Sequence, residues 1–528
     1  MTCLIGLFLL VPGHLHATQA PPKNRIGLCG NSDYYNEIRT LWEQLKPLYR
    51  KWIEDSAVTP YNLYNIQTET DNALEYAGYC RDMYMLDELA NLYLLAVDTL
   101  NETDEYIFYY YPLDGPRCSK HRLKAKHRLW LDREGHESIL VSSQFLYLIS
   151  RTLQILCNVP PEERTPGMRK FIAIYPAILH DHYQRWIFTS PGPFQVRGWG
   201  CKVKGKYVRT GMNHAEFLTR KLRNELGDKS CPSYCNAVTD TDMWIIAGAA
   251  CLTATGRVHA DILSQKEIAK YIKYIQTGIR LLKSRITYKR LQDWNGNPVT
   301  GANFDLGAWD DHSDYDYAGF KPSIYPKPYQ DLHIKFRAKN VGWDLSHARR
   351  FVHVFGALHD NRGILDLSFP DDTFMKQLAN QFLYGAFNGD FKKPLFSNFM
   401  DGTNGWFRVG YDGRTGFGYG PLDMSIAALT GGYGFWSKYN HDIEKLYSSL
   451  LAMLNSNDPE VREHVREHYE TNYWSHFKRP HSINFSKHPL SVSTRRVMFQ
   501  LLPSLCFQHK GEWLMNSVGR STAKIQDK

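Results

Sequence analysis

The densest group of side chains that could do chemistry is the run WDDHSDYDYAGF at residues 309–320, which crowds aspartates, one histidine and two tyrosines together. Burying so many polar groups costs free energy unless the segment faces water or a ligand. Tyrosine and histidine can transfer protons, and Trp309 offers a flat face to a sugar. The run is therefore a candidate active-site loop. A solvated acidic turn or a calcium loop is the alternative, although no EF-hand spacing supports calcium.

A second group is arranged by helical spacing within NVGWDLSHARRFVHVFGALHDNRG at 340–363. A helix that begins near Asp344 places Asp344, His347 and Arg350 about one turn apart. His347 and Arg350 could then face one cleft together, with Trp343 directly before the helix. The alternative is a solvated network of charged residues that only caps the helix.

Two shorter runs place acid–base residues just before predicted helices. TGMNHAEF contains Asn213 and His214 after a glycine-rich segment, and DREGHES contains Glu137 before an apolar helix. A glutamate at a helix start is commonly a capping or dipole contact. Glu137 and His214 are therefore open to a structural or a catalytic interpretation.

Glycines alternate with aromatic residues in SNFMDGTNGWFRVGYDGRTGFGYGP at 397–421. Glycine lets the backbone approach a ligand closely. Trp406, beside Asn404 and Arg408, provides what stacking on a pyranose and holding its carboxylate require. A β-hairpin with tight turns is the structural alternative.

Amphipathic helices must position these runs, because apolar residues repeat at three- and four-residue steps along much of the chain. The predicted helices cover 86–100, 146–156, 163–188, 236–254, 268–282, 344–359, 372–386, 421–430, 443–453 and 492–506. The long connecting loops are 191–212, 292–342 and 387–420. We therefore predict a mostly α fold, an (α/α) toroid or barrel whose long loops form the active-site cleft.

The composition narrows the class of ligand. The 528-residue chain has a formal net charge of +9, and 14% of its residues are aromatic. A basic surface attracts polyanions. No run of five Lys or Arg residues and no zinc-finger spacing supports nucleic-acid binding. We expect an acidic polysaccharide as the partner and no nucleic acid.

The N-terminal segment at 1–20 combines an apolar core with small residues near its end, as in a cleaved secretory signal peptide. No linker composition divides the remainder, so 21–528 is predicted to be a single catalytic domain. No later stretch reaches the roughly 18 uninterrupted apolar residues of a membrane span. We expect a secreted protein, periplasmic if the source is bacterial, with no membrane partner.

Metal and cofactor motifs do not stand out in the sequence. It contains no Walker loop, no HExxH and no Rossmann glycine fingerprint. Cys231 and Cys235 have half-site spacing, but a disulfide between them, or disulfides to partners such as Cys201 and Cys251, fits better than zinc. We expect no metal and no cofactor.

Taken together, the Asn-His pair, the WDDHSDYDYAGF loop, the WDLSHARRFVHVF helix and the NGWFRVGYDGRTGFGYGP segment resemble polysaccharide lyase family 38, the alginate and glucuronan lyases, over about residues 75–440. The resemblance implies β-elimination on a helical toroid without a cofactor. A base removes the C5 proton of a uronate, an acid protonates the leaving O4, and other groups neutralise the carboxylate.

The resemblance also implies roles for individual residues. Tyr315 would transfer the proton, with Tyr317 as its competitor, and Asn213, His214 and a protonated Glu137 would surround the carboxylate. The residues expected to bind substrate are His347, Arg350, Trp309, Trp343, Asn404 and Trp406.

Three other functions fit parts of the pattern. An inverting glycoside hydrolase would use Glu137 with Asp310 or Asp311. A uronyl epimerase would abstract the same C5 proton and return it to the other face. A non-enzymatic protein that binds acidic glycans would need only the basic and aromatic surface.

Overall fold

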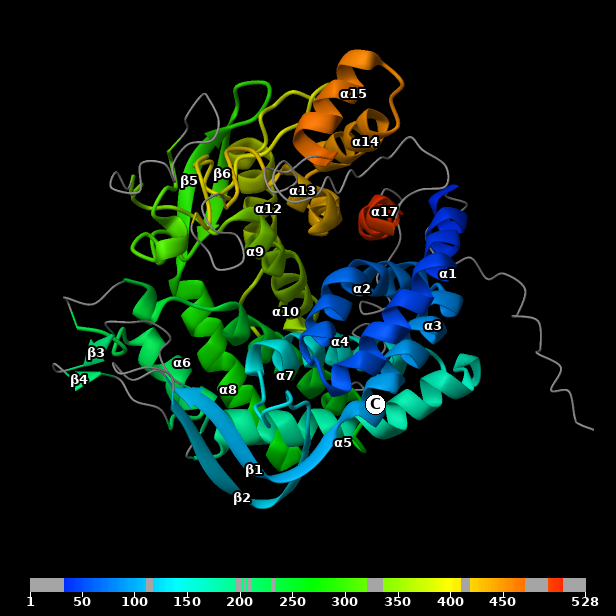
Figure 1. Ribbon diagram of the computed structural model, residues 1–528, viewed down its shortest axis with the longest axis vertical. Coiled ribbons are helices and arrows are strands. Elements are labelled where there is room, and N and C mark those ends of the chain that lie inside the picture. The colour runs from blue at the N-terminus through cyan, green and yellow to red at the C-terminus, as the bar shows by residue number, and fades with distance from the viewer. Residues whose placement is uncertain are drawn as a thin grey trace, which may run out of the picture.

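The computed structural model describes residues 33–110, 117–190, 192–194, 201–203, 206–207, 211–228, 233–320, 336–409, 418–470 and 492–506. Helices make up most of these residues, which confirms the prediction of a mostly α protein (Figure 1). The predicted signal segment at 1–20 lies outside the described residues.

Each predicted helical range coincides with a helix or with consecutive helical segments. The helices of the first half are α1 (Asp33–Glu54), α2 (Tyr61–Cys80), α3 (Met83–Leu94), α4 (Ile139–Cys157), α5 (Pro166–Phe188), α6 (His214–Leu222), α7 (Asp240–Val258) and α8 (Gln265–Ser284). Those of the second half are α9 (Leu345–Arg350), α10 (Gly356–Asp360), α11 (Arg362–Leu365), α12 (Asp372–Asn380), α13 (Ser425–Thr430), α14 (Asp442–Leu454), α15 (Pro459–Val465) and α17 (Val492–Leu505). π-Helical turns follow α9 at Phe351–Phe355, α12 at Gln381–Ala386 and α15 at Arg466–Glu470.

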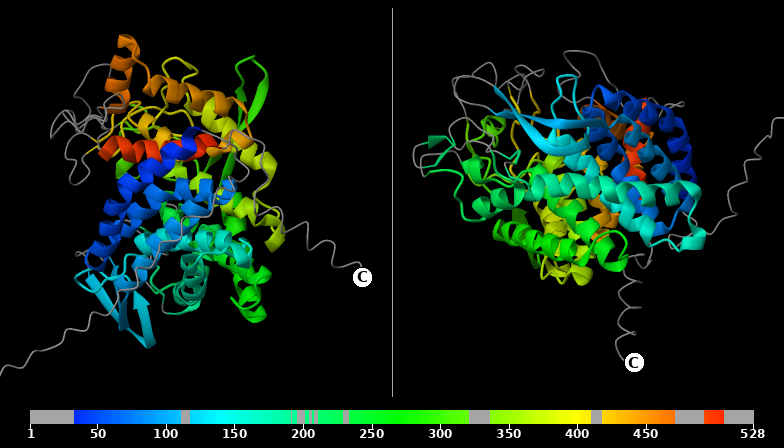
Figure 2. Two further views of the ribbon diagram at one scale, coloured as in Figure 1. Left: turned by 90° about the vertical axis from the view of Figure 1, so that its right-hand side faces the viewer. Right: turned by 90° about the horizontal axis from the view of Figure 1, so that it is seen from below.

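The strands form antiparallel two-stranded hairpins. They pair β1 (Asn101–Tyr110) with β2 (Arg117–Leu129), β3 (Lys202–Val203) with β4 (Lys206–Tyr207), and β5 (Ile286–Gln292) with β6 (Pro298–Phe304). Figure 2 shows the β1–β2 hairpin projecting beyond the helices.

The prediction of a loop over 292–342 is wrong at its start, because Pro298–Phe304 is a strand. Asn295 and Gly296 form the turn before it, and Gly296 has a φ of +81°, which a residue without a β-carbon adopts without strain. Asp293 closes the connection by accepting from the backbone N–H groups of Asn295 and Asn297. Turn chemistry therefore decides this segment.

The core is organised around α4, whose side chains are buried on nearly every face. Most of its residues are apolar, and buried polar residues such as Gln144 and Arg151 are hydrogen-bonded within the core. By length and composition α4 could also cross a membrane, but 89% of its apolar window is buried inside the protein. Burial in a protein core accounts for its composition.

Starting from α4, each helix packs against the next in a series of contacts. Helix α4 packs against α2 and α7, and α7 packs against α9 and α10. Helix α13 packs against α9 and α17, and α17 packs against α2. The last described helix therefore lies beside α1 and α2 from the start of the chain, as Figure 1 and the left view of Figure 2 show.

The cysteines of the described residues fit a disulfide better than a metal site. Cys235 forms a disulfide with Cys201, one of the two partners expected for it. Cys251, the other expected partner, is a buried free thiol in α7. Cys231 lies outside the described residues.

Candidate functional site

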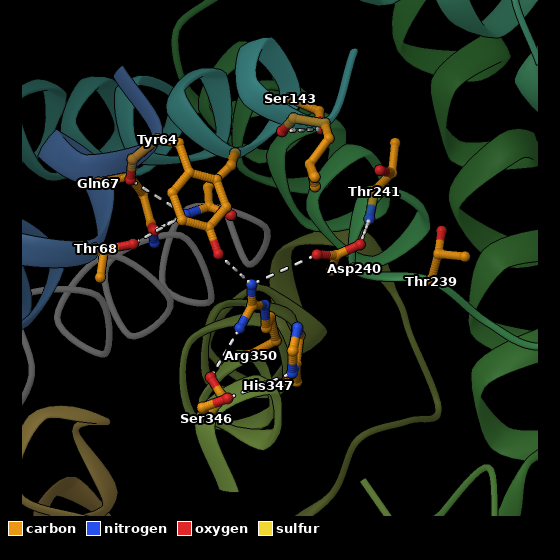
Figure 3. A network of polar contacts seen from close by, with 12 residues as sticks. Tyr64, Gln67, Thr68, Ser143, Thr239, Asp240, Thr241, Ser346, His347 and Arg350 are labelled. Carbon is orange, nitrogen blue, oxygen red and sulfur yellow. Dashed lines mark hydrogen bonds and ion pairs between the residues drawn. The ribbon is translucent and has the colours of Figure 1, made fainter. Parts of the chain in front are cut away.

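Arg350 connects the end of α9 with the first turns of α2 and α7. Its Nη2 donates to the Tyr64 hydroxyl at 2.9 Å and lies 3.4 Å from Asp240 Oδ2, and its Nη1 donates to the Ser346 carbonyl at 2.9 Å. Tyr64 is in the first turn of α2, Asp240 begins α7, and Arg350 ends α9 (Figure 3). The Arg350 side chain is only 3% exposed. Burial alone lowers its pKa, but Tyr64 and Asp240 raise it, so the guanidinium stays charged.

His347 lies one turn earlier on α9 and is held by Asp344. Asp344 caps the helix, and its Oδ2 lies 2.7 Å from His347 Nδ1. Burial opposes ionisation of Asp344, but His347 lowers the pKa of its carboxyl to about 2. An ionised Asp344 selects the His347 tautomer that is protonated on Nδ1 and leaves Nε2 as an acceptor. The His347 side chain is 25% exposed.

Arg408 approaches the other ring nitrogen of His347. Its Nη2 is 3.3 Å from His347 Nε2, and its Nε donates to Asp314 Oδ2 at 3.0 Å. Arg408 has a φ of +57°, a left-handed backbone conformation that is strained for a residue other than glycine. A hydrogen bond from its backbone N–H to the Asp314 carbonyl holds this conformation. Strained residues cluster at functional sites, and this one carries a guanidinium that is 27% exposed.

We refer to Tyr64, Asp240, His347, Arg350 and Arg408 as the Arg350 cluster. It combines two guanidinium groups, a phenol, an imidazole and one carboxylate that is 21% exposed. Its residues come from α2, α7, α9 and the segment before 410. Such a set can bind an anion and transfer protons next to it.

A buried layer of amides supports the cluster from α2 and α4. Gln144 Nε2 donates to Gln67 Oε1 at 2.6 Å and to Thr68 Oγ1 at 3.2 Å. Arg349 donates to the Thr68 carbonyl at 2.9 Å. These contacts fix α2 against α4 and α9, so the position of Tyr64 is determined by packing (Figure 3).

The π-helical turn Phe351–Phe355 begins directly after Arg350. Such turns are rare and occur frequently at functional sites. The turn contributes buried aromatic rings, with Phe351 and Phe355 both packed on Phe304. It anchors the end of α9 and with it the side chain of Arg350.

Tyr315 lies near Asp344 and Arg408 but is itself buried. Its ring is buried against Phe399 and Phe407, and the Asp344 backbone hydrogen-bonds its phenol. Burial raises the pKa of Tyr315 well above its usual range. A phenol buried in this way does not fit the expected proton transfer to a polymer. Its competitor Tyr317 is also buried, in a small cluster with Trp406.

His214 and Asn213 are engaged in the fold. His214 is fully buried, with Nδ1 2.6 Å from the Tyr274 hydroxyl and Nε2 3.0 Å from Asp242 Oδ1. Burial lowers the pKa of His214. Asn213 caps α6 by accepting from the Glu216 N–H, and its amide donates to Ser190. Neither residue is brought to the Arg350 cluster.

Glu137 does not fit the expected role of a protonated acid. Arg185 donates to both of its carboxylate oxygens, at 2.7 and 3.0 Å, and Trp186 donates at 3.2 Å. Burial opposes ionisation, but Arg185 lowers the pKa of Glu137 below its usual range. Glu137 is an ionised, fully buried structural residue.

The remaining predicted binding residues lie in packed surroundings. Trp343 is buried against Phe304 and Phe351, and the partly buried Trp309 packs edge-on against it. Trp406 is buried. Asn404 accepts from the Leu422 backbone N–H at 3.0 Å. Of the predicted binding residues, only His347 and Arg350 belong to the Arg350 cluster.

Sequence reasoning missed Tyr64 and Asp240 altogether. Asp240 lies in TDTD before an apolar run, where it resembles a helix cap, and Tyr64 lies in a segment without chemical motifs. The one available signal is the tyrosine pair at Tyr61 and Tyr64, whose spacing places both on one helix face. Arg408 was expected beside Trp406 as a guanidinium that could hold a carboxylate, but not as a contact of His347.

The described part of the chain contains no arranged metal-binding site. Among those residues, no group of three or more His, Cys, Asp or Glu side chains is arranged to hold an ion. Asp310 accepts from the Asn340 and Val341 N–H groups, and Asp311 accepts from Ser233, so both carboxylates hold loops together.

No protein-family model matches the chain, and no curated protein matches it.

Proposed function

We propose that this protein is a polysaccharide lyase that cleaves a uronic-acid polymer, such as alginate or glucuronan, by β-elimination at the Arg350 cluster. The observation that carries the proposal is the meeting of Tyr64, His347, Arg350 and Arg408 in one partly exposed group. Elimination next to a carboxylate needs a base, an acid and cations, and this group supplies all three.

His347 is the proposed base. Its Nδ1 faces the ionised Asp344, so Nε2 carries the lone pair, which in this structure accepts from Arg408 Nη2 at 3.3 Å. We propose that Arg408 turns from Nε2 to the uronate carboxylate when substrate binds, and that Nε2 then accepts the C5 proton. Asp344 also stabilises the imidazolium that then forms. An Asp–His pair of this kind orients the ring in the same way in other proton-transfer sites.

Tyr64 is the proposed acid. Its oxygen accepts from Arg350, so its O–H proton can be donated to the leaving glycosidic oxygen. The guanidinium then stabilises the phenolate that remains. This assignment moves the proton-transfer role from Tyr315 to a tyrosine in contact with a cation.

Arg408 is the proposed partner of the uronate carboxylate, and Arg350 adds positive charge nearby. Neutralising the carboxylate makes the C5 proton more acidic and stabilises the enolate-like transition state. Arg408 keeps part of its guanidinium exposed while Asp314 holds its Nε. A uronate carboxylate would bind at this exposed edge of the guanidinium.

The packing order of the helices supports an (α/α) toroid as the scaffold. The contacts run from α2 to α4, α7, α9, α13 and α17 and return to α2, so they form a closed circuit. Tyr64, Asp240 and Arg350 come from three members of that circuit. A secreted location for the enzyme also remains part of the proposal, together with an acidic polysaccharide partner for a chain of net charge +9.

The carboxylates assigned to a hydrolase are already hydrogen-bonded within the fold. An inverting enzyme needs one protonated acid and one free base. Glu137 is bound by Arg185, while Asp310 and Asp311 are bound by backbone N–H groups. Elimination needs none of the three.

The test is to incubate the purified protein separately with polymannuronate, polyguluronate, glucuronan and glycosaminoglycans. Elimination creates a C4=C5 double bond conjugated to the carboxylate, and its ultraviolet absorbance rises with each cleavage. We expect such a rise on one polymer. New reducing ends without this absorbance would mean hydrolysis, and binding without either product would mean a glycan-binding protein.

A further inference from the structure

Asp240 is the member of the Arg350 cluster that the proposed elimination leaves without a role. Its side chain is 21% exposed and lies beside the Arg350 guanidinium. A carboxylate in this place repels the carboxylate of a uronate and so weakens the binding of an acidic ligand. A favourable contact with the ligand would offset this cost.

The start of α7 does not need Asp240 as a cap. Thr239 caps this helix, and Asp242 closes the capping box by accepting from the Thr239 N–H. Asp240 is the first residue of the helix, and its Oδ1 accepts from the Thr241 N–H at 3.0 Å. The capping of α7 therefore does not account for the exposed carboxylate.

Arg350 is held more closely by other partners than by Asp240. The Tyr64 hydroxyl and the Ser346 carbonyl each accept from the guanidinium at 2.9 Å, whereas Asp240 Oδ2 lies 3.4 Å from Nη2. The longer distance exceeds the usual range of N–H···O hydrogen bonds. Because each carboxylate oxygen can accept two hydrogen bonds, a ligand that approaches from solvent can donate to Asp240 as well.

The position of Asp240 relative to the proposed acid and base selects the donor. The Tyr64 hydroxyl and Asp240 Oδ2 both contact the same nitrogen, Arg350 Nη2. Figure 3 shows Asp240 and His347 on one side of the Arg350 side chain and the Tyr64 ring on the other. Asp240 therefore faces the uronate that loses its C5 proton, close to the oxygen that Tyr64 protonates.

We propose that Asp240 accepts a hydrogen bond from the 3-hydroxyl group of this uronate. C3 is bonded to C4, so its hydroxyl is the one on the uronate ring that lies next to the glycosidic O4. The inference rests on the proposed function, because it uses Tyr64 as the acid and His347 as the base. It also narrows the substrate class, since an ester at O3 removes the donor. The preferred polymer is therefore a uronan without O3 esters.

Two disaccharides isolate this hydrogen bond. The first is the methyl glycoside of the uronate with one sugar on O4, so it contains a single bond for elimination. The second differs only by hydrogen in place of the 3-hydroxyl. In both, a base removes the C5 proton, the C4–O4 bond breaks, O4 takes up a proton, and an absorbing C4=C5 double bond forms. Inhibition of polymer cleavage by each disaccharide gives the same comparison as a ratio of inhibition constants.

We expect loss of the 3-hydroxyl to lower kcat/KM of the wild type at least tenfold, as loss of a hydrogen bond to a charged group does. Asp240→Ala should treat the two disaccharides alike. Asp240→Asn should recover part of the discrimination, because an amide oxygen still accepts. Asp372→Ala is the matched control and should discriminate as the wild type does. It also removes the first residue of a helix, α12, that another residue, Asp371, caps.

The outcomes separate the two proposals. A folded Asp240→Ala protein that loses activity equally on both disaccharides overturns the hydrogen bond, because Asp240 would then act through Arg350. A wild type that does not distinguish the disaccharides also overturns it, while elimination itself still stands. A wild type that forms no unsaturated product from any of the uronate polymers contradicts the proposed function and the hydrogen bond with it.

Discussion

Two carboxylates in the first turn of α7 are used in opposite ways. Asp240 is 21% exposed and lies beside Arg350 in the candidate site. Asp242, two residues later, is fully buried between His214 and Lys221 and closes the capping box with Thr239. Both regions contain an acid, a base and a cation, but only the region around Asp240 has partly exposed side chains. Residue type therefore does not identify the site, whereas exposure to solvent does.

The largest effect is expected where the exposed region loses its central cation. Arg350→Gln should lower kcat/KM for the polymer by about 10³-fold, because it removes a charged donor that stabilises the Tyr64 phenolate. Steady-state kinetics by ultraviolet absorbance measures the loss. Arg280→Gln, on the exposed face of α8, is the matched control and should retain full activity. A loss below tenfold in a folded Arg350→Gln protein would remove Arg350 from the mechanism.

A substitution in the buried region around Asp242 should lower stability and leave activity nearly unchanged. Asp242→Asn leaves Lys221 as a buried charge without its partner, which costs about 3–5 kcal/mol of unfolding free energy. Denaturant unfolding measures the change. The activity of the fraction that stays folded should be close to that of the wild type. A stable Asp242→Asn protein without turnover would instead bring the buried group into the catalytic site.

The pH should have a smaller effect on the free energy of unfolding, about 3 kcal/mol at most, through the buried His182. Burial, together with Arg185, lowers the pKa of His182 from 6.5 to about 4. Below pH 6.5 the unfolded chain therefore binds a proton that the folded chain does not bind. The contribution to stability is complete above pH 6.5 and is lost as the pH falls towards 4. His182→Gln should flatten this part of the pH–stability curve, measured by denaturant unfolding, and an unchanged curve would contradict the assignment.

Local pattern predicted much of the fold. Apolar spacing located α4, α8 and α14, because a helix repeats its buried face within a few residues. It also put His347 and Arg350 on neighbouring turns of one helix. The hairpin β5–β6 was not predicted, because the turn at Asn295 and Gly296 was assigned to a long loop.

The rest of the candidate site depends on contacts between distant residues. Arg350 and Tyr64 are 286 positions apart in the chain, and no local pattern pairs them. In the same way, nothing near Glu137 in the sequence indicates that Arg185 neutralises it. Burial also separates Tyr64 from Tyr315, although the motif-rich surroundings of Tyr315 are the more conspicuous in sequence.

The most direct test of the account compares these two tyrosines. Tyr64→Phe and Tyr315→Phe each remove one hydroxyl, and turnover of the same polymer is followed by ultraviolet absorbance. We expect Tyr64→Phe to lose activity about 10²–10⁴-fold, the usual contribution of an acid catalyst, with unchanged thermal stability. Tyr315→Phe should keep its turnover to within about threefold and change mainly in stability, as loss of a buried hydrogen bond does. The reverse result, an active Tyr64→Phe and an inactive but stable Tyr315→Phe, would contradict the assignment of the site to the Arg350 cluster.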